Sequence, residues 1–210
     1  MTMTGSSLVR SLLIAFLAAT AFAGPATRGD ADGQVAKPPM TAPWRVEIKG
    51  PTMRVTSGDL SVDFRQSTAW TISRICYRKQ QLVGPHGSQG TVITWGKKFV
   101  GTGHGGEVVH RFVIRSDGRE YEPKEGEATT ITGREISVVK ESTIGPFRCV
   151  AKTIFPKEGE FILSRYRYKV EKPLDNLGRI YVFMHCVENQ FKDYLAVLPD
   201  STVLAERVDK

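Results

Sequence analysis

Positively charged residues occupy alternate positions along one short stretch of the chain, a spacing that would place their charges side by side. Arg165, Arg167 and Lys169 occupy every second position within residues 161–171. In a β-strand such residues share one face, roughly 6.6 Å apart for a rise of ~3.3 Å per residue. A row of like charges needs water, neighbouring carboxylates or an acidic ligand beside it. We therefore predict a ligand-binding sheet face here, and the alternative is a solvated face interleaved with glutamates.

Tryptophan rings offer a second kind of contact. A flat apolar ring complements the C–H face of a pyranose, so Trp70 and Trp95 are candidate sugar platforms. The alternative is that they belong to the core, as tryptophan in β-proteins often does. Together with the three cations, these two side chains form the predicted ligand-binding set.

Histidine is the side chain that would move a proton near neutral pH. His185 lies in an apolar run, so a hydrogen-bonded structural role is the alternative to acid–base chemistry. His104 and His110 flank Glu107, but the chain has no H-E-x-x-H and no zinc-spaced cysteine pair. We predict no metal and no cofactor.

Residues 101–106 formally satisfy G-x-G-x-x-G. A dinucleotide site needs a helix after that loop, whereas residues 107–115 have the pattern of a strand. The glycines instead predict a long hairpin or a loop on the active face. The chain contains no G-x-S-x-G, and among the glutamates no pair stands out for glycoside hydrolysis.

Short runs rich in valine, isoleucine, threonine and aromatic residues must position these groups. Turn residues separate the runs, and apolar and polar residues alternate within them. The predicted strands are 44–48, 52–56, 60–64, 70–77, 91–95, 107–115, 129–132, 135–140, 147–155, 161–171, 180–188 and 194–198. This pattern predicts an all-β, antiparallel β-sandwich. One short helix is expected over residues 200–208.

The N-terminus predicts export. Residues 1–23 combine one charge at Arg10, an uncharged apolar run and a terminal Ala-Phe-Ala, which is typical of a cleavable signal peptide. A retained anchor is the alternative, but the run is shorter than the ~20 residues that span a bilayer. Residues 24–43 are rich in glycine and proline and predict a flexible leader. Residues 44–210 are expected to form one domain, secreted or periplasmic, without a membrane span.

The formal net charge is +7, which favours acidic partners. The basic residues are spread along the chain without a block of five, so nucleic-acid binding is not predicted. Three cysteines, Cys76, Cys149 and Cys186, permit at most one intramolecular disulfide, and each is expected to be a small buried side chain.

One family resemblance rests on two segments. Residues 58–64 (GDLSVDF) and 70–83 (WTISRICYRKQQLV) resemble the opening strands of galactose-mutarotase-like supersandwich domains. The later long strands are similar to that family's broad sheets. The resemblance implies carbohydrate contact rather than one reaction. Family catalysis uses a histidine pair and a glutamate on the concave sheet, for which His110, His185 and Glu188 are the candidates.

The sequence thus supports three hypotheses. The first is an exported β-sandwich that binds carbohydrate without catalysis, with acidic polysaccharide as the favoured class. The second is a small sugar epimerase or polysaccharide lyase in which a histidine is the acid or base. The third is an envelope module that binds another protein.

Overall fold

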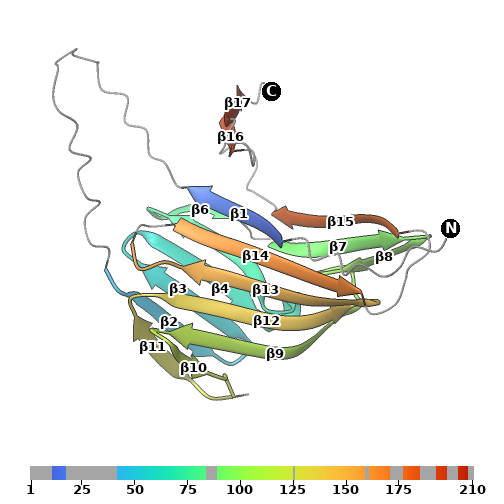
Figure 1. Ribbon diagram of the computed structural model, residues 1–210. Helices are drawn as coiled ribbons and strands as arrows, with labels where there is room; N and C mark the ends of the chain where they lie inside the picture. Colours follow the sequence, from blue (N-terminus) through green and yellow to red (C-terminus); the bar gives the residue numbers. More distant parts are fainter. Residues whose placement is uncertain are drawn as a thin grey trace, which may run out of the picture.

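A computed structural model describes residues 11–17, 42–83, 89–124, 126–158, 161–170, 177–184, 193–197 and 203–207 (Figure 1). The strands are β1 (Ser11–Leu17), β2 (Trp44–Lys49), β3 (Thr52–Ser57), β4 (Leu60–Arg65), β5 (Thr71–Tyr77), β6 (Gln80–Val83), β7 (Gln89–Trp95), β8 (Lys98–Gly101), β9 (Glu107–Ser116), β10 (Arg119–Tyr121), β11 (Thr129–Gly133), β12 (Ile136–Ile144), β13 (Phe147–Phe155), β14 (Phe161–Val170), β15 (Leu177–Met184), β16 (Asp193–Val197) and β17 (Val203–Arg207). A single 3-10 turn, η1 (Gln66–Thr68), follows β4.

The strands form antiparallel sheets. Sheet A has the order β1-β14-β13-β12-β9-β10, sheet B the order β11-β2-β3-β4-β5-β6, and sheet C the order β15-β7-β8. Strands β16 and β17 form a separate hairpin. The four long strands of sheet A face sheet B over one part of their length and sheet C over the other (Figure 1). We call the face of sheet A that points away from sheets B and C its outer face.

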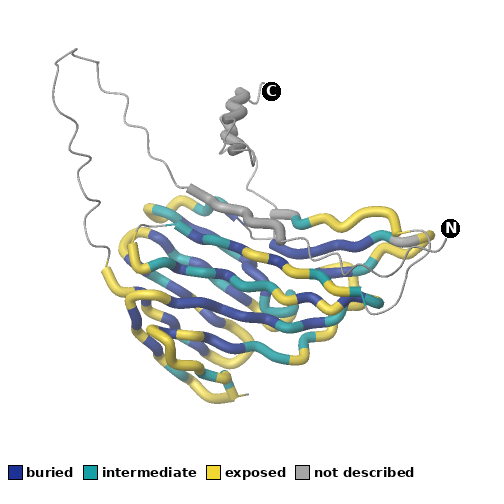
Figure 2. The backbone as a smooth tube through the Cα atoms, in the orientation of Figure 1, coloured by how far each residue is buried: buried dark blue, intermediate teal, exposed yellow. Residues whose placement is uncertain are grey.

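Alternation of side chains explains why these residues form a sandwich. In β4, Leu60, Val62 and Phe64 are buried while Ser61 and Asp63 are half-buried. Figure 2 shows the same alternation of buried and more exposed positions along the strands of sheet A. One face of each strand therefore supplies the core, as the period-two pattern predicts.

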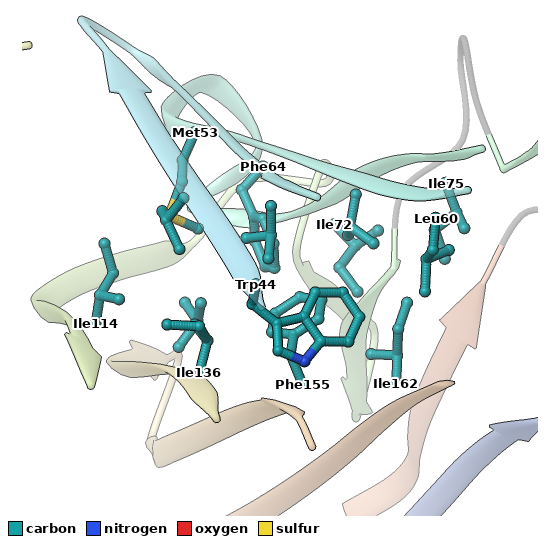
Figure 3. Close-up of a cluster of buried hydrophobic side chains, with 14 of the residues drawn as sticks. Trp44, Met53, Leu60, Phe64, Ile72, Ile75, Ile114, Ile136, Phe155 and Ile162 are labelled. Carbon is teal, nitrogen blue, oxygen red and sulfur yellow. The ribbon is translucent and has the colours of Figure 1, made fainter. Parts of the chain in front are cut away.

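The main core lies between sheets A and B (Figure 3). Trp44 on β2 is fully buried and packs against Phe155 on β13, with ring centroids 5.1 Å apart. Its indole Nε1 donates a hydrogen bond to the carbonyl of Pro156 (2.8 Å). A smaller cluster, formed by Ile93, Ile144, Phe147 and Cys149, joins sheets A and C. Two apolar clusters thus hold sheets B and C against sheet A.

The predicted all-β, antiparallel sandwich is confirmed, and most predicted strands match within a few residues. Strands β6, β8 and β10 were not predicted because they are short and partly polar. The helix predicted over residues 200–208 is wrong, since Val203–Arg207 pairs with β16.

The predicted signal peptide and leader lie mostly outside the described residues. Within residues 1–23 the structure describes Ser11–Leu17, which forms an edge strand beside β14. Export stays a prediction. Within the described ranges no helix is long and apolar enough to cross a membrane.

Candidate functional site

The predicted row of cations lies on the outer face of sheet A. Arg165, Arg167 and Lys169 of β14 are exposed. Ser164, which precedes them, and Tyr166, which lies between the two arginines, are buried toward the core. The alternation predicted for this strand is therefore confirmed. The three charged groups share one face and point away from sheets B and C.

The neighbouring strand extends this row. Lys152 of β13 is the register partner of Arg165, and Arg148 is the partner of Lys169. Val150, 38% exposed, lies between them opposite Arg167. We call Arg148, Lys152, Arg165, Arg167 and Lys169 the cationic face. The alternative expected from the sequence, a face on which glutamates lie between the cations, does not occur on β13. Like charges therefore lie opposite one another.

The glutamate of β10 and the glutamate of β12 on sheet A form ion pairs with arginines of β9. Arg111 of β9 forms ion pairs with Glu120, Glu122 (3.2 Å) and Glu141 (3.4 Å). The hydrogen bond with Glu122 and the charge of Glu120 raise the pKa of Arg111. Among the salt bridges of the described residues, none involves Arg165, Arg167 or Lys169. The side chains of Arg165, Arg167 and Lys169 are exposed.

A second feature is a cavity of about 610 Å³ on the inner side of sheet A. Its walls are the turn after β4, the glycine loop between β8 and β9, and the start of β9. The lining residues are Gln66, Ser67, Ala69, Trp70, Gly101, Gly103, Gly105, Glu107, Val108 and Val109. This volume falls within the ~300–1,000 Å³ typical of small-molecule sites.

Glu107 is the charged group of this cavity. Its side chain is 4% exposed, and Lys140 Nζ donates to its Oε1 over 2.6 Å. Ser142 Oγ donates to the same oxygen (2.9 Å), and Thr102 Oγ1 donates to Oε2 (2.6 Å). Desolvation lowers the pKa of Lys140, an effect that the negative charge of Glu107 opposes. The cavity therefore borders a buried, hydrogen-bonded ion pair.

Trp70 forms another wall of this cavity, and its ring is held in place by Phe112. Its ring stacks on Phe112, with centroids 4.6 Å apart and planes inclined by 16°. Ala69 and Trp70 both have positive φ, of 53° and 52°. Non-glycine residues adopt this conformation at a cost of roughly 1–3 kcal/mol each, and such strain concentrates at ligand sites.

Trp70 also borders a much smaller cavity, of about 20 Å³, together with Lys140 and Gln89. Gln89 is 2% exposed, and its amide Nε2 has no hydrogen-bond partner among the described residues. A space of this size can hold one water molecule. The polar interior around Lys140 thus continues behind Trp70.

The structure separates the predicted ligand-binding residues. The cationic face lies on the outer side of sheet A, while Trp70 packs inside against the core, so they do not form one surface. Trp95 ends β7, and its side chain lies outside the described residues. The Glu107–Lys140 pair was not predicted.

The histidines also lie apart. His110 is the extra residue of a β-bulge between β9 and β12, and its Nε2 is 3.0 Å from Thr143 Oγ1 on the outer face. His104 is exposed and packs edge-on to Phe99. His185 and Glu188 lie outside the described residues. In the described part of the chain no group of acidic, histidine and cysteine side chains could hold a metal.

Comparisons of the chain with protein-family models, curated proteins and solved structures found no match. The resemblance to galactose-mutarotase-like domains stays a prediction.

Two cysteines occupy interior positions, as predicted. Cys76 and Cys149 are buried and free, and burial raises the pKa of Cys149 to about 12. Because the thiolate is the reactive form, we expect neither thiol to react with iodoacetamide at neutral pH in the folded protein. Peptide mass mapping after labelling, with a urea-unfolded sample as control, measures this. Equal labelling of Cys149 in both samples would contradict it.

Proposed function

We propose that this protein is exported and binds acidic polysaccharide on the cationic face, without catalysis. The observation that carries the proposal is the placement of cations opposite cations on β13 and β14, with no acidic side chain as a register partner in that pair of strands. A surface that repels itself is stabilised when an anionic chain lies along it. The signal-peptide pattern of residues 1–23 supports export.

The geometry suits a polymer better than a single small anion. Charged heads spaced at alternate strand positions lie roughly 6.6 Å apart, so successive cations meet successive anionic groups of an extended chain. Each exposed ion pair contributes little, and several together give avidity. Guanidinium groups also bind carboxylate and sulfate through two parallel hydrogen bonds.

Binding rather than catalysis follows from the groups on the cationic face. Guanidinium and ammonium groups offer hydrogen-bond donors and no acceptor, which suits the binding of anions rather than the removal of a proton from a substrate. The large cavity contains Glu107 but no histidine among its described lining residues. The epimerase or lyase hypothesis therefore gains no support from either site.

Removing single charges should weaken this binding. We expect Arg165→Ala and Arg167→Ala each to raise the Kd for polygalacturonate by roughly three- to tenfold at low salt, because each removes one ionic contact. Both side chains are exposed, so the unfolding free energy should change by less than about 0.5 kcal/mol. Calorimetric titration at low and physiological salt, with thermal melts, measures both effects.

The matched control is Arg45→Ala, which removes the same charge from sheet B. It should leave the Kd nearly unchanged. Equal weakening by Arg45→Ala and Arg167→Ala would show that only net charge matters. Absence of binding to polygalacturonate and to sulfated glycans would rule out the proposal.

A further inference from the structure

The cavity beside Trp70 lies on the opposite side of sheet A from the cationic face and needs its own explanation. Its glycine loop is held by backbone hydrogen bonds, from Gly101 N to Gly105 O (2.9 Å) and from Thr102 N to Thr91 O (2.9 Å). A Cβ added at Gly103 or Gly105 would meet no atom within 4 Å. The loop thus presents bare backbone to an open and preformed space.

The charges at the cavity wall disfavour both anionic and cationic ligands. Glu107 is neutralised by Lys140, so the wall carries no net charge from this pair. An anionic ligand would meet a buried carboxylate, and a cationic ligand would compete with Lys140 for it. Uncharged ligands avoid both penalties.

The hydrogen-bonding capacity of Glu107 is nearly filled. An ionised carboxylate offers about four acceptor positions, and three are taken by Lys140, Ser142 and Thr102. One acceptor position remains, on a group that lines the cavity, and it suits a hydroxyl donor. Gln66 and Ser67 add polar side chains at the same wall, while Trp70 adds a flat apolar ring.

We infer that this cavity is a second binding site, independent of the cationic face, for a small uncharged ring compound that bears hydroxyl groups, of the size of a monosaccharide. The apolar face of such a ring packs on Trp70, and one of its hydroxyls donates to Glu107. The positive φ of Ala69 and Trp70 is a sign consistent with this role, because backbone strain of this kind concentrates at ligand sites.

NMR titration of the purified full chain tests the inference, with glucose, galactose, mannose and N-acetylglucosamine as neutral probes and glucuronate as the charged comparator. At least one neutral probe should cause saturable shifts of backbone amides in 66–70 and 101–109, with a Kd of roughly millimolar order. At these same amides glucuronate should bind more weakly, whatever shifts it causes on the cationic face. Absence of saturation with every neutral probe, or tighter binding of glucuronate at these amides, would overturn the inference.

An occluding variant locates the site. Gly103→Asn adds a side chain at a glycine that lines the cavity, at a φ of +73°, which asparagine tolerates. The Kd of the bound probe should rise at least about tenfold. The control Gly118→Asn makes the same change in open space at the β9–β10 turn and should leave the Kd unchanged. An unchanged Kd in Gly103→Asn would show that the probe binds elsewhere. Arg167→Ala should not alter this binding, which separates failure here from failure of the polysaccharide proposal.

Discussion

Replacing Glu107 by glutamine is expected to destabilise the protein by about 3–5 kcal/mol, although the substitution changes almost no volume. The Lys140 side chain is 7% exposed, and Glu107 supplies its only ion pair in the described residues. Glutamine removes that counter-charge and leaves a buried ammonium group uncompensated. Breaking one side of a buried pair has a larger effect than removing the whole pair.

The stability lost in Glu107→Gln should decrease as the pH rises. Burial already lowers the pKa of Lys140 from the ordinary value of 10.5, and losing Glu107 lowers it further. Between the folded and unfolded pKa values the unfolded chain binds more protons, so the stability of the variant rises with pH in that window. The stability difference from the wild-type protein should therefore be smaller at about pH 9.5 than at about pH 7.

Urea unfolding at both pH values measures this prediction. Glu141→Gln is the matched control, because Glu141 is 45% exposed and pairs with Arg111 on the surface, and it should change stability by less than about 1 kcal/mol. Combining Glu107→Gln with Lys140→Met should recover much of the loss, since no buried charge remains. An unchanged urea midpoint in Glu107→Gln would disprove the burial of this pair.

Gly101→Ala is the second change with a large expected effect, a loss of about 3–5 kcal/mol. Gly101 has a φ of +146°, and an added Cβ would lie 2.0 Å from the carbonyl oxygen of Thr91 and 2.8 Å from Val92 Cα. Both contacts are with the backbone of β7, so β8 would have to move away. The loop that forms one wall of the cavity would move with it.

The control for this change is Gly103→Ala, two residues further along the same loop. Its Cβ would meet nothing within 4 Å, so only the strain of a positive φ remains, roughly 1 kcal/mol. Thermal and urea unfolding of the two variants separate the steric effect of the added Cβ at residue 101 from the strain of a positive φ. Similar stabilities for Gly101→Ala and Gly103→Ala would contradict the close approach of β8 to β7.

The sequence predicts the elements well because each strand is patterned locally. Ile162, Tyr166 and Tyr168 alternate with the cations of β14, and burial follows that alternation. What cannot be read locally is which strands share a sheet and where a bulge occurs. The extra residue at His110 shifts the alternation of β9, so that Glu107 and Phe112 both face inward although they are five positions apart. A strict period of two would place them on opposite faces.

One local signal for the cavity site is present in the sequence. In residues 136–144 the core-facing positions are Ile136, Val138, Lys140, Ser142 and Ile144. A lysine in the middle of a mostly apolar face requires a buried partner. Its identity depends on pairing between β12 and β9, which is a property of the fold and not of either segment. The stacking of Trp70 on Phe112 is non-local for the same reason.

The order of sheet A has a consequence for the exported molecule. Strand β1 lies within the segment that a signal peptidase would remove, and it alone covers the free side of β14. Its removal would leave β14 as an open edge, where unpaired backbone groups attract strands of other molecules and promote aggregation. Arg165, Arg167 and Lys169 oppose such pairing, because two copies of this edge would bring their charges together. In the proposed exported form, these cations would therefore disfavour edge-to-edge pairing between copies.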